Sequence, residues 1–241
     1  MPATPALFRI VLSMLLLALT VRGLADEPER HLFILSGQSN MTGGLAKGFT
    51  ETVGKEFGAG NIEVAMSMKS GRGIRFWVAD YEAPEGSRLA GKKSADNGSE
   101  YPKLLNAAEK TGDARSFASV TFVWMQGESD GGNGMSAAYA ESFRKLRKRL
   151  MADLGLKRMN TVIGRISDFG LHGDKADGWR EVRDAQVKLA EELENGAWID
   201  TDDLNDAEGK PEGHLHYPKE QSIALGNRFA NRAIGLIRDR R

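Results

Sequence analysis

Apolar residues along this chain gather in five short runs separated by longer mixed segments. Most of the runs are continuous rather than alternating, which is typical of strands that are covered on both faces of a sheet. The predicted strands are residues 32–35, 62–68, 120–125, 161–166 and 197–200. These strands alternate with helical patterns, so the pattern predicts a parallel sheet with helices on both faces.

The segments between the strands carry apolar residues at helical spacing. One helix is expected to follow Ser136, which can cap it, and its inward positions are Tyr139, Phe143, Leu146 and Leu150. Further helices are expected at 179–194, near 102–108 and after Pro218. Glycine is dense at 42–60, and glycine and serine are dense at 86–99, and we expect long loops in both segments.

The first 25 residues have the composition of a secretory signal peptide. Arg9 precedes an apolar stretch at 10–21, and small residues follow at Gly23 and Ala25. The apolar stretch is too short to span a bilayer comfortably, although an uncleaved anchor is the alternative. We therefore expect export to the periplasm or the extracellular space, with one domain at 26–241.

The charge balance and the cysteine content exclude several classes of function. The chain has 33 basic and 33 acidic residues, and loss of Arg9 and Arg22 with the signal peptide leaves 31 basic against 33 acidic, a net charge of −2. A general nucleic-acid binder would show a basic excess, so we expect no nucleic-acid partner. Because the chain has no cysteine, thiolate catalysis and thiolate metal sites are excluded.

Two polar clusters directly follow predicted strands. In HLFILSGQSNM (31–41), Ser39 comes just after the strand and close to Gly37, where it can offer its hydroxyl and its own N–H to a substrate. In WMQGESD (124–130), Gln126 can donate to a developing oxyanion and Glu128 can orient a neighbouring group. Ordinary surface turns are the alternative for both segments.

Two further segments carry candidate chemistry. The glycines of SGRGIRFW (70–77) leave backbone N–H groups free to point at an anion, or else form a flexible turn. In GHLHYP (213–218), two histidines stand at i and i+2. No spacing of the HExxH kind accompanies them, so we expect no metal site. One histidine near Ser39 would suffice as a general base.

The combination of GQSNM, WMQGESD and a late HY before a helix resembles the SGNH-type esterases, specifically the sialate O-acetylesterase / carbohydrate esterase family 6 branch. The resemblance runs from about residue 31 to 230 and includes VIGRISD (162–168) and WREVRDAQ (179–186). It implies a flavodoxin-like three-layer α/β/α sandwich with a five-stranded parallel sheet.

The resemblance also implies roles for individual residues. Ser39 would be the nucleophile and His216 the general base, because a serine hydroxyl is weak until a base takes its proton. The oxyanion would be held by the N–H groups of Ser39 and Gly71 and by the Gln126 side chain. Gln38 and Glu128 would form the supporting polar network.

One position departs from the family pattern. Members of this group usually carry Asp three residues before the catalytic histidine, and here that place is Gly213. The acid that orients the imidazole is therefore open. Glu128 is the first candidate and Glu212 the second, and the remaining candidates are Asp202, Asp203 and Asp206. His214 can share or take the role assigned to His216.

We therefore expect an exported serine carbohydrate esterase that removes O-acetyl groups from an acetylxylan or sialate type of glycan, without a cofactor and without a membrane partner after signal cleavage. A catalytically inactive glycan-binding relative is one alternative. Another hydrolase on the same scaffold, such as a lipase or thioesterase, is a further one. Trp77 and Trp179 are expected either to stack on sugar rings or to serve as packing residues.

Overall fold

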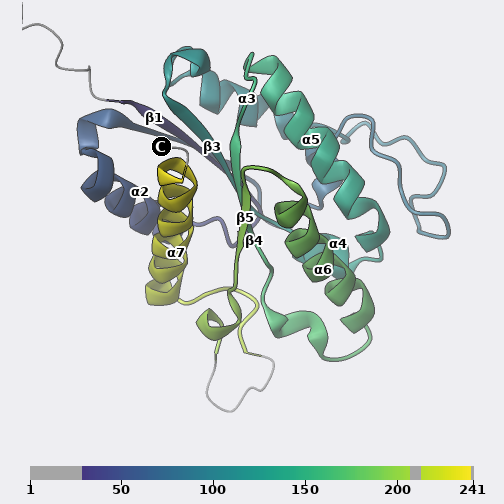
Figure 1. The fold of residues 1–241 in the computed structure, drawn as a ribbon. Coiled ribbons are helices and arrows are strands. Elements are labelled where there is room, and N and C mark those ends of the chain that lie inside the picture. Colours follow the sequence, from purple (N-terminus) through teal and green to yellow (C-terminus); the bar gives the residue numbers. More distant parts are fainter. Residues whose placement is uncertain (1–28, 207–212, 240–241) are drawn as a thin grey trace, which may run out of the picture.

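The fold is built on one five-stranded parallel sheet. The structure, a computed structural model, describes residues 29–206 and 213–239 (Figure 1). The signal-peptide prediction at 1–25 and the candidate acid Glu212 lie outside these residues. The strands are β1 (His31–Gly37), β2 (Ile62–Met68), β3 (Ser119–Met125), β4 (Asn160–Gly164) and β5 (Gly196–Ile199). Their order, β2-β1-β3-β4-β5, is the flavodoxin-like one, and each predicted strand is present.

Helices cover both faces of the sheet. One layer contains α2 (Gly43–Phe57) and α7 (Lys219–Arg238), and the other contains α3 (Tyr101–Glu109), α5 (Tyr139–Asp153) and α6 (Ala176–Glu192) (Figure 1). A short helix, α4 (Glu128–Gly132), follows β3 and packs on α6. The predicted three-layer sandwich is confirmed. None of the helices in the described ranges combines the length and apolar character needed to cross a membrane.

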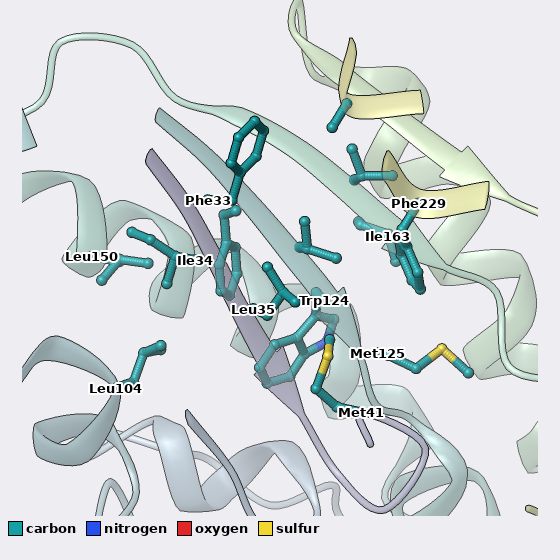
Figure 2. Packing of buried hydrophobic residues seen from close by; sticks show 14 of the residues in the cluster. Phe33, Ile34, Leu35, Met41, Leu104, Trp124, Met125, Leu150, Ile163 and Phe229 are labelled. Carbon is teal, nitrogen blue, oxygen red and sulfur yellow. The ribbon is translucent and has the colours of Figure 1, made fainter. Parts of the chain in front are cut away.

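The core lies between the sheet and the two helical layers. Phe33, Ile34 and Leu35 of β1 are fully buried. Figure 2 shows the side chains of the sheet packed between Leu150 of α5 on one side and Phe229 of α7 on the other. Both faces of β1 are therefore apolar, which is why its sequence is a continuous run.

The prediction of a long loop at 42–60 is wrong, because α2 occupies most of this segment. The Thr42 hydroxyl caps the helix by accepting the Leu45 N–H at 3.1 Å. The buried side chains recur every four residues, at Leu45, Phe49 and Val53. Gly48 serves close packing, because a Cβ on it would lie 2.3 Å from the Ile223 carbonyl oxygen of α7.

The expected cap at Ser136 is also wrong. Ser136 belongs to a 3₁₀ turn, and α5 begins after Ala138 without a side-chain cap. The Ser136 hydroxyl instead donates to Glu181 Oε2 of α6 at 2.5 Å. The segment 86–99 contains no helix or strand, as expected.

Candidate active site

The carboxyl ends of three strands meet at one edge of the sheet. In the parallel register, Gly37 lies opposite Met68 of β2 and Met125 of β3, so the three loops that follow begin at the same level. Gly37 has a φ of +150°, and a Cβ on it would lie 1.9 Å from the Met125 carbonyl oxygen. Only glycine allows this close approach. The polar clusters identified in the sequence are thereby brought to one place.

Ser39 and His216 are in contact although 177 positions separate them. Ser39 lies in the turn after β1, and His216 lies in the segment that precedes α7. The distance between His216 Nε2 and Ser39 Oγ is 2.9 Å. Both residues line a cavity of about 970 Å³. A serine hydroxyl that is hydrogen-bonded to an imidazole beside a cavity is the arrangement that nucleophilic catalysis requires.

The backbone N–H groups of Ser39 and Gly71, both at this cavity, have no acceptor in the described part of the chain. Gly71 has a φ of +69°, and a Cβ on it would meet no atom within 4 Å, so open space surrounds it. Both residues line the cavity. Unpaired donors next to a nucleophile can stabilise a developing oxyanion.

The Gln126 side chain, also expected in the oxyanion hole, is fully buried and does not line the cavity. Its Nε2 donates to Gln38 Oε1 at 3.2 Å, to the Arg72 carbonyl at 3.2 Å and to Asp130 Oδ2 at 2.5 Å. The amide therefore ties the ends of β1 and β3 to the loop that carries Gly71. Gln38 also accepts the Ser129 N–H at 3.2 Å, so it is part of the same network.

Glu128 lines the cavity but is only 6% exposed. Its Oε1 accepts Asn40 Nδ2 at 2.7 Å, and its Oε2 has no partner among the described residues. Burial raises the pKa of Glu128 above the ordinary value of a glutamate. Asn40 Nδ2 also donates to the Leu215 carbonyl at 3.1 Å. Glu128 thus reaches the His216 segment through Asn40 and makes no hydrogen bond to the ring.

The upstream aspartates are engaged elsewhere. Asp202 accepts both terminal nitrogens of Arg183 at 2.7 and 2.8 Å, and Asp203 pairs with Arg228 in the same way. Asp206 is exposed. Among the described residues, no carboxylate makes a hydrogen bond to His216.

The backbone at Gly213, three residues before His216, leaves no space for a side chain. Gly213 has a φ of +69°, and a Cβ on it would lie 2.5 Å from the Asn205 carbonyl oxygen. An aspartate therefore does not fit at this position in the observed conformation. The His214 N–H donates to the same carbonyl at 2.6 Å, and the His214 ring makes no hydrogen bond to Ser39.

Sequence reasoning missed two polar residues of the site, Asn40 and Asp130. Asp130 is buried and its Oδ2 accepts the Ile74 N–H at 2.9 Å, which fixes the loop that follows Gly71. Burial raises the pKa of Asp130 to about 6, even though hydrogen bonds from Gln126 and Ile74 favour its ionised form. The sequence could have indicated Asn40 and Asp130 by their positions inside the motifs GQSNM and WMQGESD.

The far wall of the cavity is formed by residues after β4 and at the start of α6. Trp179 is 4% exposed and donates its indole N–H to the Ser167 carbonyl at 2.6 Å. Trp77 is 1% exposed and packs edge-on against Trp124. Trp77 does not line the cavity and is a packing residue, whereas the buried Trp179 lines the cavity together with the half-buried ring of Phe169.

No group of three or more His, Cys, Asp or Glu side chains that could hold a metal ion occurs in residues 29–206 and 213–239. The polar groups of the site are instead a hydroxyl, an imidazole, buried amides and buried carboxyls. This set is suited to acyl transfer by proton movement at the Ser39–His216 pair.

The parallel sheet order and the two helical layers define a flavodoxin-like α/β fold, and this fold carries a Ser–His pair at the carboxyl edge of its sheet. The chain belongs to the family described as carbohydrate esterase, sialic acid-specific acetylesterase, whose model matches residues 71–235. The family 6 branch remains a prediction within this assignment. No curated protein matches the chain in sequence at a significant level.

Solved structures share the fold. A protein from Arabidopsis thaliana has a TM-score of 0.62 and 21% identity over 86% of this chain and 99% of its own. A carbohydrate acetylesterase from Xanthomonas citri has a TM-score of 0.58 and 16% identity over 86% of this chain and 56% of its own, so this chain spans about half its length. A carbohydrate acetylesterase family member from Sinorhizobium meliloti has a TM-score of 0.54 and 14% identity over 87% and 99%.

Proposed function

We propose that this protein is an exported serine esterase that removes O-acetyl groups from a carbohydrate. The observation that carries the proposal is the 2.9 Å contact between His216 Nε2 and Ser39 Oγ, beside the unpaired N–H groups of Ser39 and Gly71. Membership of a carbohydrate esterase family supports the substrate class.

In the first step, Ser39 Oγ attacks the acetyl carbonyl carbon while His216 Nε2 takes the hydroxyl proton. The N–H groups of Ser39 and Gly71 hold the oxyanion of the tetrahedral intermediate, and in the reference enzyme one such donor is worth roughly 3–4 kcal/mol. The carbon–oxygen bond to the sugar then breaks, and the sugar oxygen receives the proton from His216. This leaves an acetyl ester on Ser39.

In the second step, His216 takes a proton from a water molecule that attacks the acetyl-Ser39 carbonyl. The same donors hold the second oxyanion. The bond to Ser39 Oγ breaks, the serine recovers its proton from the imidazole, and acetate leaves. Each proton therefore passes through one imidazole, and the reaction needs no metal or organic cofactor.

The cavity supports a substrate larger than an acetyl group. Its volume of about 970 Å³ lies near the upper end of the range for small-molecule sites. The Phe169 ring offers an apolar surface on the wall away from Ser39, and the exposed Lys175 and His172 line the same wall. Acetylated xylan and O-acetylated sialic acid are the two substrate types to compare.

The test measures acetate release from an aryl acetate, acetylated xylan and O-acetylated sialic acid. Wild type is expected to release acetate and Ser39→Ala to lose nearly all of the activity. Ser116→Ala, at an exposed serine before β3, is the matched control and should behave as wild type. Equal rates for wild type and Ser39→Ala would contradict the proposal.

Labelling by a fluorophosphonate separates this proposal from a glycan binder without activity, because covalent attachment needs an activated serine. We expect labelling at Ser39. Export is tested by sequencing the amino terminus of the protein recovered outside the cytoplasm, which should begin near Asp26.

A further inference from the structure

The His216 imidazole makes one hydrogen bond within the described residues, the one to Ser39. A general base must nevertheless be held accurately, because a displacement of about 1 Å can lower a rate by about 100-fold. His216 is also exposed, so side-chain packing does not fix it tightly.

The residue before His216 is bonded to the turn that carries the nucleophile. The Leu215 carbonyl accepts Asn40 Nδ2 at 3.1 Å, and the same nitrogen donates to Glu128 Oε1 at 2.7 Å. Asn40 is 2% exposed and directly follows Ser39. The buried Asn40 amide thus links the turn that carries Ser39 to the segment that carries His216, and the buried Glu128 carboxyl orients this amide.

The residue after His216 is bonded to the ends of two strands. The buried Tyr217 hydroxyl donates to Thr201 Oγ1 at 2.8 Å, and Thr201 Oγ1 donates to the Arg165 carbonyl at 2.7 Å. Thr201 follows β5 and Arg165 follows β4. His216 is thereby held from both neighbours in the chain.

We propose that Asn40 is a positioning residue which clamps the Leu215 carbonyl and, with the Tyr217 anchor, fixes His216 through its backbone. The buried Glu128 side chain serves as the acceptor that aims the Asn40 amide, and it is not a charge partner of the imidazole. This inference rests on the proposed esterase function.

Two observations support an acceptor role for Glu128. Burial raises its pKa, so the site disfavours the negative charge that an orienting acid would need. The geometry agrees, because Glu128 Oε1 accepts Asn40 Nδ2 at 2.7 Å and no hydrogen bond joins Glu128 to the His216 ring among the described residues. An amide oxygen at position 128 should therefore replace the carboxyl oxygen with limited loss.

The experiment compares Asn40→Ala, Glu128→Ala and Glu128→Gln in the full-length protein, with an aryl acetate as substrate. Asn40→Ala and Glu128→Ala should lower kcat by about 100-fold, because the base is no longer aligned, while KM changes by about twofold or less. Glu128→Gln should recover most of that loss and stay within about fivefold of wild type, because its amide oxygen still accepts Asn40 Nδ2. The double alanine variant should be no worse than either single one, because both remove the same clamp.

Asn61→Ala is the matched control. Asn61 Nδ2 also donates to a backbone carbonyl, that of Phe57, at 2.8 Å, but it lies at the far end of α2. It should keep the kcat of wild type. Glu212→Gln tests the rival acid, and it should leave the midpoint of the pH dependence of kcat/KM in place.

Amide hydrogen exchange supplies a readout that does not depend on activity. Residues 213–217 should exchange faster in Asn40→Ala than in wild type or Asn61→Ala. The inference is overturned if Asn40→Ala keeps wild-type kcat or exchange, if Glu128→Gln is as impaired as Glu128→Ala, or if Glu212→Gln lowers kcat as strongly as Asn40→Ala. If wild type neither cleaves acetyl esters nor reacts with a fluorophosphonate, the proposed function fails, and the exchange result still decides whether the clamp exists.

Discussion

Asp130 offers a quantitative test of the buried network beneath the site. Its carboxyl is 2% exposed, and it accepts hydrogen bonds from the Gln126 amide and the Ile74 N–H. The neighbouring Arg75 also favours the ionised carboxylate. Burial outweighs these interactions and raises the pKa of Asp130 from 3.8 to about 6.

The raised pKa determines how stability changes with pH. Below pH 3.8 the carboxyl is protonated in both the folded and the unfolded state. Between 3.8 and about 6 the unfolded chain ionises while the folded protein keeps the proton, so the free energy of unfolding falls as pH rises. Above about 6 both states are ionised and this loss is complete. At about 1.4 kcal/mol per pH unit, the full loss is about 3 kcal/mol.

Asp130→Asn removes this titration but keeps an oxygen that can accept from Gln126 and Ile74. The free energies of unfolding of wild type and variant are measured by urea denaturation at several pH values. Relative to wild type, the variant should gain about 2 kcal/mol between about pH 4.5 and about pH 7.5, the part of the titration inside that window. Parallel pH curves for the two proteins would refute the reasoning.

Three further predictions concern the backbone and the cavity. Gly37→Ala should prevent folding or lower the urea midpoint far more than Gly134→Ala. A Cβ at Gly37 would lie 1.9 Å from the Met125 carbonyl oxygen. Gly134 has open space around it, so an alanine there adds only the strain of a positive φ, roughly 1–2 kcal/mol. Phe169→Ala should raise KM for an acetylated oligosaccharide by up to about tenfold, because loss of a ring contact costs roughly 0.5–1.5 kcal/mol. The KM for an aryl acetate should change little. An equal effect on both substrates would exclude a sugar-binding role of Phe169. Gly213→Asp should lower the thermal midpoint and should not raise kcat, since the position is sterically closed; higher activity would show that an acid fits there.

The strands and the sheet architecture were predictable from the chain because their signal is local. Continuous apolar runs such as Phe33–Leu35 can be covered on both faces only inside a sheet with two helical layers. The helix at Gly43–Phe57 was not predictable in the same way. Glycine disfavours helices, and the reason for Gly48 is seen only in the close approach of α7.

The types of polar group at the site were also predictable from the sequence, since Ser39, Glu128 and His216 lie in motifs that follow strands or precede a helix. What each group contacts was decided by tertiary structure. His216 meets Ser39 across 177 positions, Gln126 is covered rather than open to the cavity, and Glu128 reaches the base only through Asn40. Local patterns specify the type and direction of an element, whereas distances between loops depend on how the helices and the sheet pack.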